Sequence, residues 1–175
     1  MDYFKETNNG SGDLTYLVKS PPRYCTTEEL ISIKASLEDL EAGNEITITF
    51  KPDIHNRYKS ITLTRMVFDL LTSFSNRIKD NFYIDIILVG EFSKAGLYHM
   101  HGIIKCNNTR VINSLRRKLA KEVGRHEIRS IHNVEKYIEY ILKDTPKRQI
   151  LRDEVIRFHH INTNTKNMPK SYNTQ

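Results

Sequence analysis

Residues 82–105 constrain the fold of this chain more than any other stretch. They contain two strongly apolar runs, FYIDIILVGE at 82–91 and LYHMHGIIK at 97–105, separated by Ser-Lys-Ala-Gly at 93–96. Runs of β-branched and aromatic residues of this length are typical of strands, and a short glycine-containing turn between two of them favours a hairpin. The sequence therefore predicts an antiparallel pair of strands over 82–105.

The segments on either side of this hairpin alternate between strand and helix patterns. EITITFK at 45–51 alternates and is β-branched, which predicts a strand, and 125–131 predicts a further short one. Helices are predicted where apolar residues recur three and four positions apart. They cover 27–41, 61–79, the segment capped by Asn108 or Thr109, 134–143 and, with a weaker pattern, 148–158.

The order of these elements is helix, then β-α-β-β-α-β, then helix. It predicts an α+β fold, a ferredoxin-like sandwich with a central antiparallel sheet and helices on one face. The other face would be open, and we expect the active site there. Along the chain we expect a polar lead-in with a helix at 1–44, the core at 45–145, and a C-terminal helix with a polar, disordered tail at 146–175.

The charge of the chain is unevenly distributed. The net charge is +6, but residues 1–44 sum to −4, while 105–129 hold eight bases against two acids. A local basic surface suits a polyanion such as nucleic acid, and an ordinary solvated helix face is the alternative interpretation. The predicted nucleic-acid-binding residues are the bases in the first part of that stretch: Lys105, Arg110, Arg116, Arg117, Lys118 and Lys121.

Other compositional features exclude several classes of protein. No run of 18 apolar residues is present, so no transmembrane helix is expected. Cys25 and Cys106 are too few for a disulfide scaffold or a cysteine-rich zinc site, and both are expected to be reduced thiols.

Two histidines stand two residues apart in the second apolar run, as His99-Met100-His101. Alternate residues of a strand point to the same face, so both imidazoles project together while Met100 points the other way, under the helices. Folding of the hairpin would bring the carboxylate of Glu91 across to them. Two imidazoles and a carboxylate can hold a divalent ion with coordination positions left for a phosphate oxygen. The alternative is that the histidines merely decorate a strand.

The predicted helix at 134–143 carries two tyrosines with different expected surroundings. Tyr137 falls in the apolar stripe and is expected to pack in the core, whereas Tyr140 lies outside it, on the side of Lys136 and Lys143. A phenol has a pKa near ~10, so it needs a neighbouring cation or metal to attack at neutral pH. Lys143, one turn from Tyr140, could supply such help. An ordinary surface tyrosine is the alternative.

These motifs together resemble those of the HUH endonuclease superfamily (histidine–hydrophobic–histidine), in particular the nuclease domain of rolling-circle replication initiators of small circular single-stranded DNA viruses and plasmids. His99-Met100-His101 matches the HUH motif, and Glu91 matches the additional acidic ligand upstream. Tyr140-Ile141-Leu142-Lys143 matches the Tyr-x-x-Lys motif, and ITITF at 46–50 loosely resembles the first motif. The order and spacing of the motifs agree over 45–143.

The resemblance implies a catalytic mechanism. A Mg²⁺ or Mn²⁺ ion held by Glu91, His99 and His101 would polarise a phosphate of single-stranded DNA or of an origin stem-loop. Tyr140 would attack that phosphate, and Lys143 would stabilise the charge. The nick would leave a 5′-phosphotyrosyl link and a 3′-OH that primes rolling-circle replication.

The resemblance also carries expectations about partners and place. The protein would act in the host nucleus if it comes from a eukaryotic virus, and otherwise in the cytoplasm, without secretion or a membrane. Relatives often carry a helicase after the nuclease, and 175 residues are too few for one. The chain would then be a stand-alone nuclease that works with a separate helicase, or an excised piece. The sequence does not indicate an oligomeric state.

Two other functions compete with replication initiation. A single-tyrosine HUH transposase would use the same chemistry, although Glu91 and the Tyr-x-x-Lys pattern favour an initiator. A catalytically inert nucleic-acid-binding module would stack bases on exposed strand aromatics, but here the outward sheet positions carry histidine and glutamate. His55, in a polar loop, is expected to be solvent-exposed. His126 and His132 are expected at the surface, with support of the metal ligands as the alternative, and His159-His160 receives no role.

Overall fold

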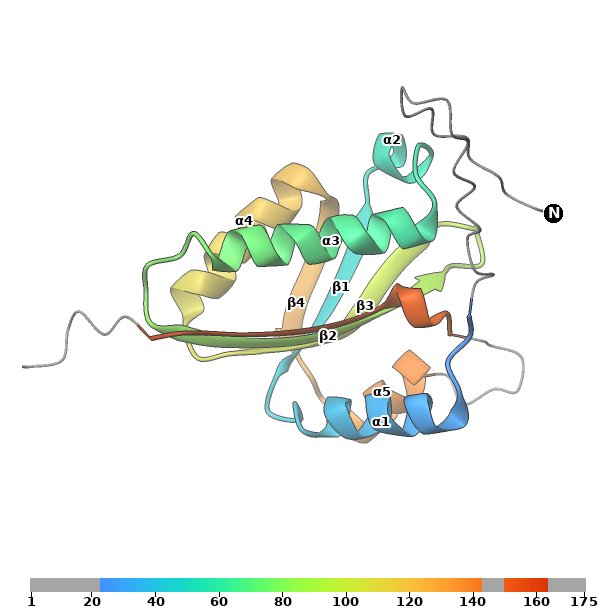
Figure 1. Ribbon diagram of the computed structural model, residues 1–175, viewed down its shortest axis with the longest axis horizontal. Coiled ribbons are helices and arrows are strands. Elements are labelled where there is room, and N and C mark those ends of the chain that lie inside the picture. Colours follow the sequence, from blue (N-terminus) through green and yellow to red (C-terminus); the bar gives the residue numbers. More distant parts are fainter. Residues whose placement is uncertain (1–22, 143–149, 164–175) are drawn as a thin grey trace, which may run out of the picture.

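The computed structural model describes residues 23–142 and 150–163, which form one sheet with helices on both faces (Figure 1). The strands are β1 (Asn44–Phe50), β2 (Phe82–Phe92), β3 (Tyr98–Cys106), β4 (Gly124–Ser130) and β5 (Val155–Asn162). The helices are α1 (Thr27–Glu38), α2 (Pro52–His55), α3 (Ser60–Ser75), α4 (Thr109–Glu122), α5 (Val134–Leu142) and the 3₁₀ turn η1 (Arg152–Glu154). The strand order is β4-β1-β3-β2-β5, all antiparallel, which confirms the predicted α+β, ferredoxin-like sandwich.

The hairpin of β2 and β3 lies where the sequence predicts it. Hydrogen bonds close its turn: the backbone N–H of Ser93 donates to Leu97 O over 2.8 Å, that of Gly96 to Ser93 O over 2.9 Å, and that of Leu97 to Ser93 Oγ over 3.1 Å. Gly96 has φ of 75° in this turn, a conformation that costs glycine little and other residues more. The turn therefore fixes the register that pairs Glu91 with His99.

One face of the sheet packs against α3 and α4, which lie above it in Figure 1. Alternate strand residues point into this core, among them Ile48, Leu88 and Met100, and the helices contribute Leu71 and Leu115. All five side chains are at most 1% exposed. Burial of each contributes roughly 1.5–3 kcal/mol, so this core forms the rigid base of the sheet.

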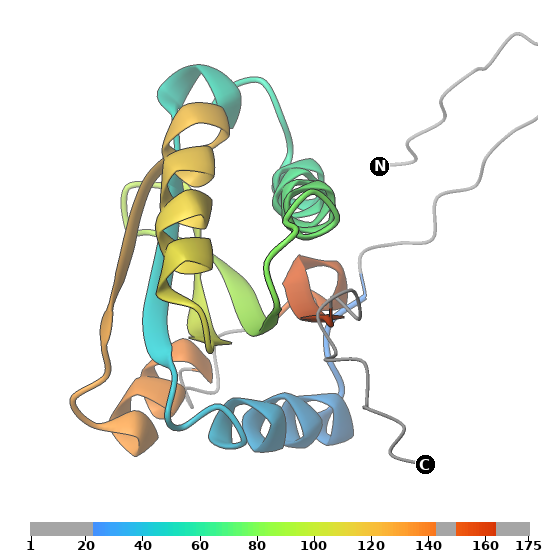
Figure 2. The same ribbon diagram turned by 90° about the vertical axis from the view of Figure 1, so that its left-hand side faces the viewer.

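The opposite face carries α1 and α5, as Figure 2 shows. Ile33 and Leu37 of α1 and Ile141 of α5 are buried there against Val89 and Ile103 of the sheet. This differs from the expectation of an open face, because the predicted apolar stripes of α1 and α5 need a surface to cover. A capping box begins α1, with the N–H of Glu29 donating to Thr26 Oγ1 over 3.2 Å.

The helix predicted at 148–158 is wrong, since its described residues, from 150 on, include η1 and the first half of β5. Ile156 and Phe158 are buried while Arg157 and His159 are exposed, which is a period of two rather than of a helix. β5 pairs with β2, so β2 becomes an inner strand, as β3 already is between β1 and β2. The polar tail expected to be disordered lies, from residue 164 on, outside the described residues. No helix in the described ranges is both long enough and apolar enough to cross a membrane.

Candidate metal centre

Glu91, His99 and His101 converge on the face of the sheet that carries α1 and α5. Glu91 pairs with His99 across the hairpin, and His101 follows two residues later on the same side of β3. Glu91 Oε2 lies 3.0 Å from His101 Nε2 and 3.6 Å from His99 Nε2, and the two imidazole centroids are 5.2 Å apart. One ligand atom from each residue falls within 4.8 Å of the others. The juxtaposition predicted from strand periodicity is therefore present.

The burial of these three side chains suits a partly enclosed ion. The exposed fraction is 2% for His101 and 8% for Glu91, but 18% for His99. Two imidazole nitrogens and a carboxylate oxygen are a donor set that divalent metals accept. The group can hold a metal ion, and the strand pairing fixes the three donors before an ion arrives.

Tyr98 anchors the start of β3 beneath this centre. It is 1% exposed, its ring lies 5.1 Å from that of Phe92 and 5.9 Å from that of Phe50, and its hydroxyl shares a 2.7 Å hydrogen bond with Thr64 Oγ1 on α3. Gly90 lies under the hydroxyl: a Cβ there would be 1.9 Å from it. The residues next to Glu91 and His99 are thus locked against the core.

His55 provides a second anchor that the sequence analysis did not identify. The backbone N–H of Tyr98 donates to His55 Nε2 over 2.8 Å, so α2 is tied to the residue before His99. The expectation of a solvent-exposed loop histidine is wrong, because His55 is partly buried in α2. No sequence signal identifies this contact, since it joins residues 43 apart.

The two tyrosines of α5 lie as their helical positions predict. The ring centroid of Tyr140 is 5.3 Å from that of His101, with the planes at 72°, and Tyr140 is 50% exposed. Tyr137 is partly buried, and its hydroxyl donates to Gly102 O over 3.1 Å. Burial and then the neighbouring Tyr140 raise the pKa of Tyr137 to about 12. Tyr140 is therefore the tyrosine beside the candidate metal ligands, while Lys143 lies outside the described residues.

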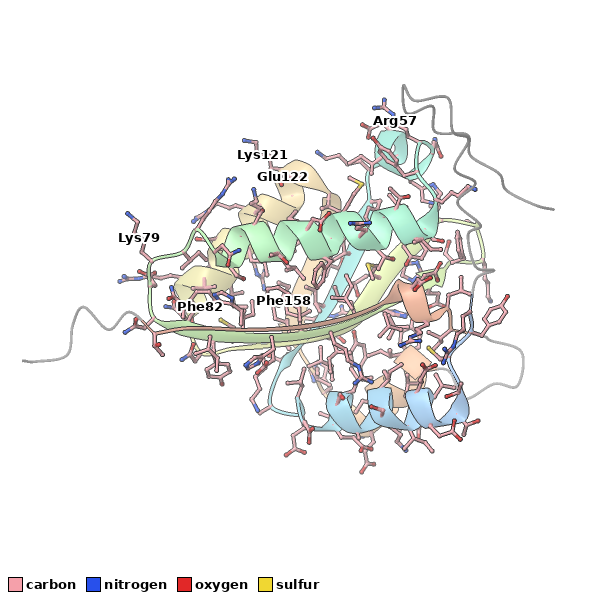
Figure 3. The ribbon with its side chains drawn as sticks, viewed as in Figure 1. Arg57, Lys79, Phe82, Lys121, Glu122 and Phe158 are labelled. Atoms are coloured by element: carbon pink, nitrogen blue, oxygen red, sulfur yellow. The ribbon has the colours of Figure 1, made fainter. Side chains whose placement is uncertain are left out.

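The structure separates the predicted nucleic-acid-binding residues from this centre. Those on α4 lie on the opposite face of the sheet, where Figure 3 shows Lys121 beside Glu122. The guanidinium of Arg116 donates to Ile128 O, and Lys118 Nζ lies 2.6 Å from Glu122 Oε1, so part of this charge is used within the protein. Arg110, Arg117 and Lys121 are exposed.

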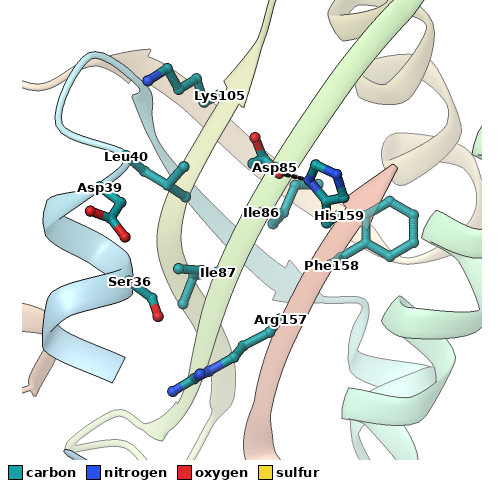
Figure 4. Close-up of a pocket in the computed structure, with 10 residues that line it drawn as sticks. All are labelled: Ser36, Asp39, Leu40, Asp85, Ile86, Ile87, Lys105, Arg157, Phe158 and His159. Atoms are coloured by element: carbon teal, nitrogen blue, oxygen red, sulfur yellow. Dashed lines mark hydrogen bonds and ion pairs between the residues drawn. The ribbon is translucent and has the colours of Figure 1, made fainter. Parts of the chain in front are cut away.

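Lys105 lies on the face of the sheet that carries Glu91, His99 and His101, called the metal-bearing face after this candidate site, but near the far end of β3. It lines a hollow of about 370 Å³ between α1 and strands β2 and β5 (Figure 4). His159 pairs with Asp85 there, and Arg157 donates to Ser32 Oγ over 3.1 Å. Three residues of β3 separate Lys105 from His101, so Lys105 is not brought to the candidate metal ligands.

Several polar residues near the centre were not predicted as site residues. Thr47 and Thr49 of β1 pair with His101 and His99, so their side chains share the metal-bearing face. Arg125 and Arg129 of β4 lie beyond them on the same face. Alternate residues of a strand share a face, so the patterns of 45–51 and 125–131 could have assigned these four side chains to one face, once the pairing of the two strands was known.

Comparisons with known proteins identify no relative: no protein-family model, no curated protein and no solved structure matches this chain. Any statement about function therefore rests on the residues themselves and on their arrangement.

Proposed function

We propose that this protein is a metal-dependent endonuclease that nicks single-stranded DNA through Tyr140 and thereby initiates rolling-circle replication. The observation that carries the proposal is the position of Tyr140, whose ring lies 5.3 Å from that of His101 beside a three-residue metal-ligand group. Separate elements, β2, β3 and α5, supply these side chains. A half-exposed tyrosine at such a centre is typical of covalent phosphoryl-transfer sites.

The residues present divide the chemistry between them. Glu91, His99 and His101 would hold Mg²⁺ or Mn²⁺, which when bound supplies positive charge to a non-bridging oxygen of the scissile phosphate. The Tyr140 oxygen then forms a bond to phosphorus, and the bond from phosphorus to the 3′ oxygen breaks. The phenolic proton passes to water, and the leaving 3′ oxygen takes a proton from water. The products are a 5′-phosphotyrosyl link and a free 3′-OH.

The surroundings of Tyr137 make it unsuitable for this attack. Its hydroxyl hydrogen is donated to Gly102 O, and burial raises its pKa to about 12. Formation of a phenolate there would break that hydrogen bond in a poorly solvated position. Of the two tyrosines of α5, Tyr140 is therefore the proposed nucleophile.

The position of the centre also suggests where DNA lies. A strand that reaches Tyr140 must cross the metal-bearing face near Thr47 and Thr49, since α1 and α5 cover the other half of that face. The exposed bases of α4 would then contact DNA remote from the nick, such as the duplex part of an origin stem-loop.

The covalent intermediate gives the direct test of this proposal. The protein is incubated with a pool of randomised single-stranded oligonucleotides and Mn²⁺, and the products are separated on a denaturing gel. We expect a DNA-linked protein band that is absent in EDTA and returns with excess Mn²⁺. Nicking without any covalent band would contradict the tyrosine mechanism, and a band of full strength in EDTA would contradict the metal.

A further inference from the structure

A second hollow of about 420 Å³ lies beside Tyr140, between α5 and strands β1 and β4. Tyr140 borders both this hollow and the candidate metal centre, because it lines the hollow and its ring lies 5.3 Å from that of His101. The volume is in the range of about 300–1,000 Å³ that is typical of small-ligand sites. The hollow thus adjoins the candidate metal centre through Tyr140, and its size suits one nucleotide.

The lining of this hollow combines aromatic rings with cations. One helical face supplies Asn133, Lys136, Tyr137 and Tyr140, which are three or four residues apart. Tyr137 and Tyr140 are nearly parallel, with centroids 6.3 Å apart and planes at 22°. The remaining lining residues come from β1, β4 and the segment that joins β4 to α5: Glu45, Arg129, Ile131 and His132.

Arg129 and Lys136 are both exposed cations of the hollow, and the guanidinium of Arg129 is held by carboxylates. Arg129 forms an ion pair with Glu45, and its Nη1 lies 3.8 Å from Glu127 Oε2. Lys136 is exposed, and its backbone N–H donates to Asn133 Oδ1 over 2.8 Å, which fixes the first turn of α5. Aromatic faces that stack a base, next to cations that meet a phosphate, are the recognition chemistry of single-stranded nucleic acid.

We propose that this hollow binds the nucleotide on the 3′ side of the nick, whose 5′ phosphate becomes joined to Tyr140. The inference rests on the proposed function. In an in-line attack the tyrosine oxygen and the leaving 3′ oxygen lie on opposite sides of phosphorus. The strand that ends in the 3′-OH therefore departs on the side away from Tyr140. The nucleotide that stays linked to Tyr140 needs a place directly beside this residue, and the hollow is that place.

The arrangement makes Lys136 the group that meets the next phosphate along the retained strand. Holding this nucleotide would keep the phosphotyrosyl end in position while the 3′-OH strand is exchanged. A later 3′-OH would then meet the phosphorus at the same place, so the rejoining step would start from reacting groups that are already oriented.

The test pairs a change in the protein with a change in the DNA. The probe is a single-stranded oligonucleotide whose nick site has been mapped by sequencing adducts formed from the randomised pool. Dissociation constants are measured in a Tyr140→Phe background, in which the DNA stays uncut. An uncharged methylphosphonate replaces either the phosphate that follows the scissile one or the phosphate that precedes it. Lys136→Ala is compared with Lys34→Ala, an exposed lysine of α1 outside the hollow.

We expect the uncharged linkage after the scissile phosphate to weaken binding about fivefold when Lys136 is present, the size of one exposed ion pair. In Lys136→Ala the same linkage should cause no further loss, whereas in Lys34→Ala the fivefold loss should remain. The linkage before the scissile phosphate should act equally in all three proteins. The inference would be overturned if the linkage after the scissile phosphate weakened binding as much in Lys136→Ala as in the parent protein. It would also be overturned if Lys136→Ala removed the effect of the linkage before the scissile phosphate. Either result would leave the proposed function intact. Absence of any adduct from the randomised pool would contradict the proposed function, and this inference with it.

Discussion

Tyr137 and Tyr140 lie one turn apart on α5, and their hydroxyl groups have different surroundings. We predict that Tyr140→Phe abolishes the covalent adduct and nicking, because no other oxygen replaces the attacking one, while the dissociation constant for single-stranded DNA stays within about twofold, since the aromatic ring is retained. The adduct is measured on a denaturing gel, and binding by fluorescence anisotropy.

Tyr137→Phe is the matched control, since it removes the same hydroxyl one turn away. It loses the hydrogen bond to Gly102 O, so the free energy of unfolding should fall by about 1 kcal/mol while the adduct still forms. An adduct in Tyr140→Phe together with its loss in Tyr137→Phe would reverse the assignment of the nucleophile.

The three proposed metal ligands should differ in how far they can be replaced. His101→Ala and His99→Ala each remove one of two imidazoles from a centre with three protein donors, so we predict loss of cleavage at any Mn²⁺ concentration tested. Glu91→Gln keeps the shape and loses the charge, so it should need about tenfold or more Mn²⁺ for the same rate. Metal affinity is measured by titration calorimetry, without DNA, alongside the rate.

A purely structural role for these residues predicts a different result. If Glu91→Gln lowers the free energy of unfolding but leaves the Mn²⁺ affinity of the folded protein unchanged, the group is an ion-paired cluster and not a metal site. Circular dichroism during urea unfolding measures the free energy of unfolding, and titration calorimetry measures the Mn²⁺ affinity.

At the residue scale, strand and helix periodicity were sufficient to predict the main site side chains. The period of two placed His99 and His101 together, and the hairpin placed Glu91 opposite them. The contact of His55 with Tyr98 could not be predicted, because it depends on how α2 packs against the sheet. Lys143 lies outside the described residues, so its predicted role stays a prediction.

At the element scale, the β2–β3 hairpin owes its fit against α3 to a missing side chain at Gly90. A Cβ at this position would lie 1.9 Å from the hydroxyl of Tyr98, which is 1% exposed and bonded to Thr64. We predict that Gly90→Ala lowers the free energy of unfolding by about 2 kcal/mol or more, as overpacking of a core does. Urea denaturation measures this change.

Gly96→Ala separates packing from backbone effects in the same hairpin. Nothing lies within 4 Å of a Cβ at Gly96, but its φ of 75° disfavours alanine, so a loss of about 1 kcal/mol is expected. If Gly90→Ala lowers the free energy of unfolding no more than Gly96→Ala does, Tyr98 moves aside and does not anchor the site.

The elements that the sequence analysis misassigned share one cause. The pattern of 148–158 predicts a weak helix, but Ile156 and Phe158 belong to β5, which pairs with the edge of β2. The face expected to be open is partly covered, because α1 and α5 must bury their own apolar stripes. In both cases tertiary partners decided the outcome, and local patterns do not reveal which surface is available.

At the scale of the whole molecule, the basic residues of α4 and the candidate metal ligands lie on opposite faces of the sheet. We predict that Ala at Arg110, Arg117 and Lys121 flattens the salt dependence of binding to a stem-loop by about 0.9 in a log–log plot for each lost duplex phosphate contact. Binding to a short single strand that spans only the nick should keep its slope. Affinity is measured between low and physiological salt.

A loss of salt dependence for the short single strand would contradict the proposed path of the DNA. If the three substitutions flatten the slope for the short single strand as much as for the stem-loop, the strand runs over α4, and the metal-bearing face is not its path.

The attachment point of the DNA tests the central claim most directly. The adduct formed with Mn²⁺ is digested with nuclease and protease, and the peptides are sequenced by mass spectrometry. The account predicts a nucleotide phosphate, joined through its 5′ end, on Tyr140. A nucleotide on Tyr137 or on any other residue, or a link through the 3′ end, would contradict it.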